Sequence, residues 1–173
     1  MANFPALSVG PWTLRPLEHD DAAPWHTLLQ DPELRRLTSW NIQSLAEMQK
    51  LVADYTDGPR AQTTRRWAIV DVDGAFCGFK DWDKSTGTAE ITYELAAAQR
   101  QRGAMSAIAS AVIDSGGAHM GLRLIKALVN VDNDASNRLL AKLGFTRTAR
   151  LPALRSCNGV VCDFFSCERA VGG

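Results

Sequence analysis

Apolar and polar residues alternate along several short stretches of the chain, and this period of two predicts strands. The alternating or largely apolar stretches lie at 12–17, 66–72, 75–82, 88–95, 124–131 and on both sides of residues 158–159. Asp73-Gly74 and Asn158-Gly159 are dipeptides typical of two-residue hairpin turns, so each predicts an antiparallel pair of strands. The stretch at 88–95 adds a third strand to the first hairpin.

Residues that cap helices precede several segments in the first third of the chain. Asp20 or Asp21 and Asp31 are N-cap candidates, and Ser44 with Glu47 forms a capping-box pattern ahead of a helix that we expect to end near residue 55. Each of these side chains can accept a hydrogen bond from the free N–H groups of a helix start. We therefore expect helices between the first strand and the first hairpin.

Two further helices are predicted in the second half of the chain. One follows Gly103, where the apolar residues of one helical face recur at i, i+3, i+4 and i+7, namely Met105, Ile108, Ala109 and Val112. We expect it to end at Gly116-Gly117, and a shorter helix to run from about Ser136 to Gly144. The order β-α-α-β-β-β-α-β-α-β-β indicates a mixed α/β fold in a single domain spanning residues 1–173.

The composition is that of an ordinary globular protein, with 46% hydrophobic and 22% charged residues. The 19 basic and 19 acidic side chains cancel, which argues against a broad nucleic-acid-binding face. No apolar run approaches the roughly 20 residues that span a bilayer, and residues 1–10 lack the pattern of a signal peptide. We expect a cytoplasmic protein with neither a nucleic acid nor a membrane as partner.

Four cysteines raise the question of a metal site or a disulfide. Cys157, Cys162 and Cys167 are five residues apart in apolar sequence, and no CxxC pair is present. The three histidines also lack metal-ligand spacing. We therefore expect buried free thiols and no metal.

The segment from Gln99 to Ile113 places Arg100, Arg102 and Gly103 where the long helix is predicted to begin. A helix N-terminus offers unpaired N–H groups and the positive end of the helix dipole, and a glycine lets a phosphate approach the backbone closely. The segment has one glycine, so it is neither a GxGxxG dinucleotide motif nor a P-loop. On these residues alone, a phosphate site and an ordinary exposed helix start both stay open.

Two segments, Tyr93 to Ala107 (YELAAAQRQRGAMSA) and Asn133 to Phe145 (NDASNRLLAKLGF), resemble motifs of the Gcn5-related N-acetyltransferases, and more narrowly of their RimJ/RimL-like branch. That branch reads approximately GYEL-x5-QGKGYATEA and N-x-x-S-x-R-L-L-x-K-L-G-F. The matching residues are Tyr93, Glu94, Leu95, Arg102 in place of a lysine, Gly103, Asn133, Ser136, Arg138, Leu139, Leu140, Lys142, Leu143, Gly144 and Phe145. Residues 13–40 and Asp163 extend the resemblance to nearly the whole chain.

The resemblance implies the GNAT fold, a central mixed and mostly antiparallel sheet flanked by helices, and acetyl-CoA as cosubstrate. The cofactor-binding residues that it implies are Leu95, Ala96, Ala97, Arg100, Gln101, Arg102, Gly103, Ala104, Met105, Ser106, Asn133 and Arg138. Two of them depart from the family pattern. Met105 stands where a small residue is usual, and Gln101 replaces a frequent glycine, so the loop must close differently if that glycine needs a positive φ.

The resemblance also implies acetyl transfer to a primary amine by direct attack in a ternary complex. Glu94 is the candidate base, acting through water, and Glu90 on the same strand face is the alternative; Glu94 could equally be a solvated or salt-bridged strand carboxylate. Ser136 is the candidate acid for the departing thiolate. Many family members use a tyrosine on this helix, but the corresponding position here is Leu140, and Ser136 matches the serine of the RimJ/RimL-like branch instead. Its other interpretation is a cap of the short helix.

The remaining candidates concern the acceptor. Asn133 would orient the pantetheine arm or a water, or be a turn residue at a strand end, and Trp40 would line the acceptor cleft or pack in the core. The expected acceptor is a protein N-terminus, such as that of a ribosomal protein, or a small amine, and by resemblance we expect a homodimer. A non-catalytic acyl-CoA-binding module, which Leu140 would suit, and a protein-interaction subunit are the other two readings of the chain.

Overall fold

The computed structural model describes residues 5–70, 75–96, 100 and 103–172. The elements of its first half are β1 (Leu7–Val9), β2 (Trp12–Pro16), η1 (His19–Asp21), α1 (Ala22–Leu28), α2 (Pro32–Leu37), α3 (Leu45–Thr56), η2 (Pro59–Gln62), β3 (Arg65–Ile69) and β4 (Ala75–Asp83). The second half holds β5 (Thr88–Leu95), α4 (Ala104–Met120), β6 (Leu124–Asn130), α5 (Asp134–Lys142), β7 (Thr146–Cys157) and β8 (Val160–Ala170).

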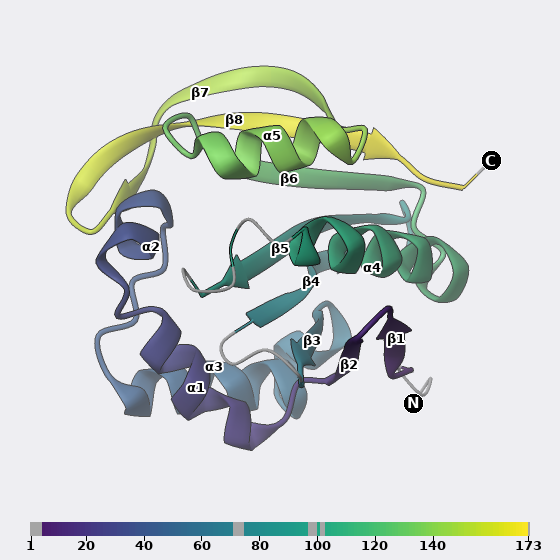
Figure 1. The fold of residues 1–173 in the computed structure, drawn as a ribbon, viewed down its shortest axis with the longest axis horizontal. Helices are drawn as coiled ribbons and strands as arrows, with labels where there is room; N and C mark the ends of the chain where they lie inside the picture. The colour runs from purple at the N-terminus through teal and green to yellow at the C-terminus, as the bar shows by residue number, and fades with distance from the viewer. Residues whose placement is uncertain (1–4, 71–74, 97–99, 101–102, 173) are drawn as a thin grey trace.

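The strands form one eight-stranded sheet in the order β1-β2-β3-β4-β5-β6-β8-β7. Every neighbouring pair is antiparallel except β5 and β6, which are parallel because the chain crosses over through α4 between them. Figure 1 shows the sheet with helices packed against it. The predicted fold, a mixed and mostly antiparallel sheet flanked by helices, is confirmed.

The parallel pair β5 and β6 is joined over only part of its length. Thr88–Glu90 pair with Leu124–Lys126, and the ladder does not continue along the described remainder of either strand. From residue 91 onward the two strands therefore separate toward their carboxyl ends. Side chains from both faces of β5 can therefore line the space between the two strands.

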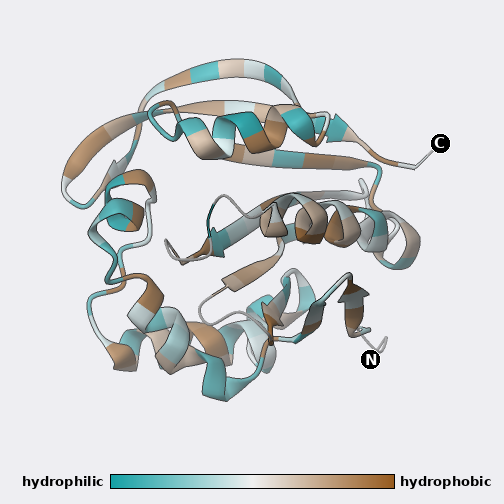
Figure 2. Cartoon of the chain, in the orientation of Figure 1, coloured by the Kyte–Doolittle hydropathy of each residue, from teal (hydrophilic) through white to brown (hydrophobic). Residues whose placement is uncertain are grey.

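Apolar side chains on the two faces of the sheet form two separate cores. On one face α4 and α5 cover residues such as Phe79, Ile91 and Val129. On the other face α1 and α3 pack on Ala68 and Phe76, with Trp25 stacked on Phe76 at 5.0 Å. Figure 2 shows α4 as mostly apolar and α5 with hydrophilic residues toward the viewer, because α5 buries only one side. Successive residues of a strand thus enter different cores.

The predicted caps form where the sequence places them. The Asp31 side chain accepts from the Glu33 N–H at 2.9 Å, and the Ser44 hydroxyl accepts from the Glu47 N–H at 3.2 Å. The Glu47 carboxylate in turn accepts from the Gln43 N–H at 2.8 Å. These contacts satisfy N–H groups that a helix start leaves free, and they fix where α2 and α3 begin.

The expected end of the long helix at Gly116-Gly117 is wrong. Helix α4 continues to Met120 and ends at Gly121, which has φ 63°. A Cβ on Gly116 would lie 2.8 Å from both Phe79 Cε2 and Leu122 Cδ1, so this glycine permits close packing of the helix on the sheet. Gly117 has open space around it. The short helix α5 likewise begins two residues before its expected start, at Asp134.

The two edges of the sheet differ in length. β1, at one edge, has three residues and was missed in the sequence pattern. β7, at the other edge, has twelve, but its pairing with β8 shifts register between Leu151 and Arg155, around Pro152. At this bulge Ala153 has φ 49°, and its N–H together with Arg150 holds the pKa of Asp163 below its ordinary value. The bulge is therefore pinned to β8.

The second hairpin turn is as predicted, and the cysteines match the expectation of buried thiols at three of the four positions. Asn158 and Gly159 have φ 50° and 82°, values that a two-residue turn of this type requires. All four cysteines are free, with Cys162 partly exposed and the others buried. The turn at Asp73-Gly74 lies outside the described residues, although β3 and β4 pair as expected. Among the described helices, none is long and apolar enough to cross a membrane.

Candidate active site

The start of α4 is built for close approach to the backbone. Gly103 is the N-cap residue with φ 71°, a conformation that side chains with a Cβ rarely adopt, and a Cβ there would meet open space. The first helical hydrogen bond runs from Ala107 N to Gly103 O at 3.2 Å. The amides of Ala104, Met105 and Ser106 precede it and are free of intrahelical partners. A helix terminus of this kind is suited to an anion.

A cavity of about 680 Å³ opens in front of this terminus, and we call it the helix cavity. Its walls come from the start of α4, the end of β5, α2 and α5, and it includes the expected cofactor residues Leu95, Arg100, Gly103, Ala104, Met105, Ser106, Asn133 and Arg138. Lys142 also lines it. Ala97, Gln101 and Arg102 lie outside the described residues. Ala96 is not part of this wall and packs against the core on the α1 and α3 face.

Arg100 is engaged with protein groups inside this cavity. Its Nε donates to the Leu95 carbonyl at 3.3 Å, and its guanidinium lies 3.7 Å from the carboxylate of Asp31, the N-cap of α2. Arg100 is thereby tied to the start of α2. Other hydrogen-bond donors in the cavity, namely the amides at the first positions of α4 and the exposed Arg138, would be available to a phosphate.

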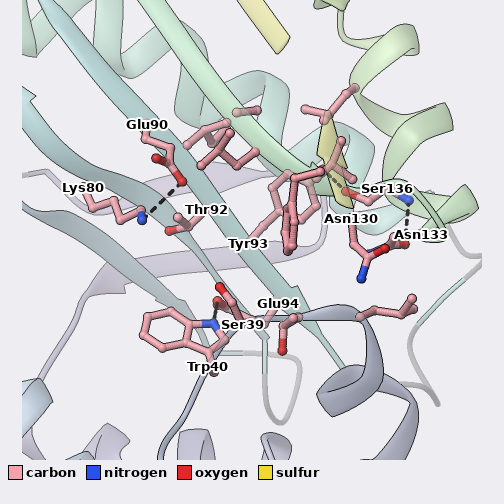
Figure 3. Close-up of a pocket in the computed structure, with 18 of the residues that line it drawn as sticks. Ser39, Trp40, Lys80, Glu90, Thr92, Tyr93, Glu94, Asn130, Asn133 and Ser136 are labelled. Atoms are coloured by element: carbon pink, nitrogen blue, oxygen red, sulfur yellow. Dashed lines mark hydrogen bonds and ion pairs between the residues drawn. The ribbon is translucent and has the colours of Figure 1, made fainter. Parts of the chain in front are cut away.

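A second cavity, of about 460 Å³, lies where β5 and β6 separate, and we call it the strand cavity. Figure 3 shows residues of its wall, including Trp40, Glu94 and Ser136. The two cavities share five lining residues, which are Leu34, Leu37, Tyr93, Asn133 and Ser136. A ligand in one cavity and a ligand in the other would therefore meet beside these side chains.

Glu94 lies on the strand-cavity wall as one member of a buried network. One carboxylate oxygen accepts from Trp40 Nε1 at 2.8 Å, and the other pairs with the guanidinium of Arg66. The side chains of Glu94 and Arg66 are 2% and 1% exposed. Arg66 also donates to Thr92 and lies 4.5 Å from the centroid of the Trp25 ring. The salt-bridged interpretation of Glu94 is therefore present, and its role as base stays a prediction.

Trp40 lies on the wall of the strand cavity and also packs in a core, while its role toward an acceptor stays a prediction. It lines the strand cavity and packs edge-to-face on Trp25, with ring centroids 5.4 Å apart and an interplanar angle of 78°. Glu90, the alternative base, forms an ion pair with Lys80 at 3.2 Å on the same wall (Figure 3). The carboxylates of Glu90 and Glu94 are thus each paired with a cation of the chain.

Ser136 and Tyr93 meet at the junction of the two cavities. Their hydroxyl oxygens are 2.6 Å apart (Figure 3), and burial raises the pKa of Tyr93, so this phenol is protonated at neutral pH. The helix-capping role considered for Ser136 belongs to Asn133, whose side chain accepts from the Ser136 N–H at 3.1 Å. The Ser136 hydroxyl is therefore free of that task.

Sequence reasoning missed Arg66 and the contact made by Tyr93. Arg66 is the second residue of strand β3 and is followed there by apolar residues, and alternation places it on the same face as Ala68 and opposite Trp67, which signals a charged group directed toward one core. Its partner Glu94 is 28 positions away, and nothing local indicates that pairing. Tyr93 entered only as a motif residue, although its position next to Glu94 places the two side chains on opposite faces.

The thiols of the chain take no part in either cavity wall. No cysteine lines the helix cavity or the strand cavity among the described residues. Burial raises the pKa of Cys77 to about 12 and that of Cys157 to about 11. Neither thiol is a thiolate at neutral pH, so neither is a ready nucleophile. The described residues also contain no cluster of His, Cys, Asp and Glu suited to a metal ion.

Comparison with known proteins places this geometry in a family. The chain is 28% identical over 165 residues to the uncharacterised N-acetyltransferase YoaA of Bacillus subtilis, covering 92% of this chain and 93% of YoaA. Ribosomal-protein-S5-alanine acetyltransferase of Vibrio fischeri superposes with a TM-score of 0.83 at 14% identity, covering 96% of each chain. Spermidine N-acetyltransferase of Vibrio cholerae, solved with CoA and spermine, gives 0.81 at 19% identity, covering 92% of this chain and 95% of that one.

The family model described as acetyltransferase (GNAT) domain matches residues 12–146. This span contains β5, α4 and α5, and also all five residues shared by the two cavities. The chain belongs to the Gcn5-related N-acetyltransferase family.

Proposed function

We propose that the chain is an acetyl-CoA-dependent N-acetyltransferase that transfers the acetyl group to a primary amine by direct attack in a ternary complex. The observation that carries this proposal is the meeting of two cavities at Tyr93, Asn133 and Ser136. One cavity has a helix N-terminus for a phosphate-bearing cosubstrate, and the other has polar and charged walls for an amine. Two bound substrates would then react without leaving the protein.

The helix cavity suits CoA in both shape and chemistry. The amides of Ala104, Met105 and Ser106 and the positive end of the α4 dipole would hold the pyrophosphate, with Gly103 giving it room. Arg138 and Lys142 on the α5 wall would contact the outer phosphates. The pantetheine arm would run along Leu95 toward the junction, which brings the thioester beside Ser136.

Direct attack by the amine fits the side chains at the junction better than an acetyl-enzyme. A covalent route needs an activated nucleophile within reach of the thioester, and no described cysteine lines the cavities. In direct attack the amine loses a proton and the thiolate gains one. Glu94 or Glu90, acting through water, would take the first proton, and Ser136 would supply the second.

For the acceptor we propose a protein N-terminus or a small amine. The charges around the strand cavity are balanced: Lys80 pairs with Glu90, Arg66 behind the wall pairs with Glu94, and the other two charged lining residues, Arg60 and Asp81, are of opposite sign. A wall with paired charges has no excess of carboxylates for a polycation such as spermine, so it favours an acceptor with a single reacting amine. The likeness to a ribosomal-protein acetyltransferase supports a place in the RimJ/RimL-like branch. The homodimeric state and the cytoplasmic location stay predictions.

The test is release of CoA thiol from acetyl-CoA in the presence of terminal peptides, single amines and polyamines. We expect turnover with at least one peptide or single amine and weaker turnover with polyamines. CoA binding without turnover on any acceptor would instead support the non-catalytic acyl-CoA-binding module. A direct binding measurement, such as calorimetry with CoA, separates that result from a failure to bind the cosubstrate.

A further inference from the structure

The hydroxyls of Tyr93 and Ser136 form an isolated pair at the junction of the two cavities. Their oxygens are 2.6 Å apart, and neither oxygen has another hydrogen-bond partner among the described residues. Both residues line both cavities. A serine oxygen can accept one hydrogen bond and donate another. When Tyr93 donates to Ser136, the serine hydrogen is free to point at a group bound in the junction.

We propose that Tyr93 is the positioning residue of Ser136 and supplies the proton that Ser136 passes to the departing CoA thiolate. The proposal deepens the proposed function and rests on it. In the step, the amine nitrogen bonds to the acetyl carbon and the carbon–sulfur bond breaks. The sulfur takes the Ser136 proton, Ser136 takes the Tyr93 proton, and Tyr93 regains one from solvent, to which the amine has released its own.

A phenol is the better matched source of this proton. The ordinary pKa of tyrosine is about 10 and that of a thiol about 8.5. Burial raises the pKa of Tyr93 above its ordinary value, yet a phenol is still a stronger acid than the aliphatic hydroxyl of serine. Ser136 alone would therefore be a poor acid, and a phenol behind it lowers the cost of giving up its proton. Because burial keeps Tyr93 protonated at rest, the pair begins each cycle with both hydrogens in place.

The strand geometry assigns this role to Tyr93 and to no neighbour. Adjacent strand residues point to opposite faces, so Tyr93 reaches α5 while Glu94 reaches Trp40 and Arg66. Position 140 of α5 holds a leucine that is 2% exposed and has no proton to give. The proton source thus comes from β5.

The kinetic test uses Tyr93→Phe, Ser136→Ala and the double variant. Tyr93→Phe keeps the ring and should lower kcat about tenfold, the size of effect expected when one hydrogen bond is lost. The KM for acetyl-CoA should change less than twofold. Ser136→Ala should lower kcat further, and the double variant should match Ser136→Ala because the phenol acts only through the serine. Ser115→Ala, a buried serine of α4 outside both cavities, is the matched control and should keep kcat.

A second measurement needs no acceptor. The ultraviolet absorbance of the CoA thiolate, followed against pH in the bound complex, reports the thiol pKa. Donation from the hydroxyl pair stabilises the thiolate, so Tyr93→Phe should raise the bound thiol pKa toward that of free CoA. Unchanged kcat and unchanged thiol pKa in Tyr93→Phe would overturn the proposal.

The same data separate the two proposals. If the protein transfers no acetyl group but Tyr93→Phe still raises the pKa of the bound CoA thiol, the contact of the hydroxyl pair with the sulfur stands and the transferase function is rejected. If the wild type turns over and Tyr93→Phe has the same kcat and the same bound thiol pKa, the transferase function stands and the role of Tyr93 is rejected. Failure of the wild-type protein to bind CoA would overturn both.

Discussion

Glu94 and Arg66 show what a single residue reveals in sequence and what it does not. A carboxylate at the end of a strand beside a predicted cofactor loop can be identified from the motif. Its environment cannot, because Arg66 and Trp40 come from positions 28 and 54 residues away. Whether such a carboxylate is solvated or ion-paired is decided by long-range packing. The structure selects the ion pair and leaves the chemical role of Glu94 to experiment.

We expect Arg66→Met to lower the free energy of unfolding by about 3–5 kcal/mol, because it leaves the Glu94 carboxylate buried without its cation. Glu94→Gln should also destabilise, by stranding the guanidinium. The double variant removes both charges and should cost less than the sum of the two single changes. Urea unfolding of the four proteins measures the difference. Strictly additive losses would show that the two side chains are not coupled.

Gly103 combines a backbone requirement with a binding role, and two variants separate them. Both Gly103→Ala and Gly103→Glu place a Cβ at φ 71°, which costs about 1 kcal/mol of stability. Glutamate also puts negative charge where the pyrophosphate would lie, so we expect it to weaken CoA binding at least about 100-fold, and alanine much less. Calorimetric titration with CoA checks both. Equal affinity of the glutamate variant and the wild type would remove this loop from the cofactor site.

Helix α4 shows why the ends of elements are harder to predict than their existence. Its amphipathic face and its start were evident from the positions of apolar residues and of Gly103. Two adjacent glycines normally end a helix, and at residues 116–117 they do not. The reason is Phe79 on β4, whose ring occupies the space that a side chain at 116 would need. Only the packed structure distinguishes a glycine that ends a helix from one that admits a neighbour.

The two glycines should respond to alanine in opposite directions. Gly116→Ala places a methyl 2.8 Å from Phe79 and Leu122, and we expect it to cost about 1–3 kcal/mol. Gly117→Ala meets no atom within 4 Å and should stabilise the helix by about 0.5–1 kcal/mol through the lower backbone entropy of alanine. Thermal unfolding of both variants gives the comparison. Destabilisation of similar size at both positions would contradict the packing explanation.

At the scale of the molecule, the sequence predicted the antiparallel strand pairs, the order of most elements and the start of α4. It did not predict the separation of β5 from β6, since this depends on how α5 and β8 pack beside β6. That separation lets Tyr93 and Glu94, on opposite faces of one strand, both line the strand cavity. The sequence therefore identifies the candidate residues one by one, but it does not predict how they are arranged around the cavities.

Two cavities that meet at one junction predict a sequential kinetic pattern. Initial rates measured against acetyl-CoA at several fixed acceptor concentrations should give intersecting double-reciprocal lines, because both substrates are bound before the acetyl group moves. No acetylated protein should be found by mass spectrometry after incubation with acetyl-CoA alone. Parallel lines together with an acetylated side chain would indicate a covalent intermediate in place of direct attack.

The bulge in β7 has a consequence for association between molecules. A long strand at a sheet edge offers unpaired N–H and C=O groups on which a foreign strand can assemble. Here Pro152 removes one donor, the register shift bends the strand, and Arg147, Arg150 and Arg155 place charge along it. The opposite edge, β1, has only three residues. The sheet is thus closed to growth at both ends, which protects the folded protein from edge-to-edge aggregation.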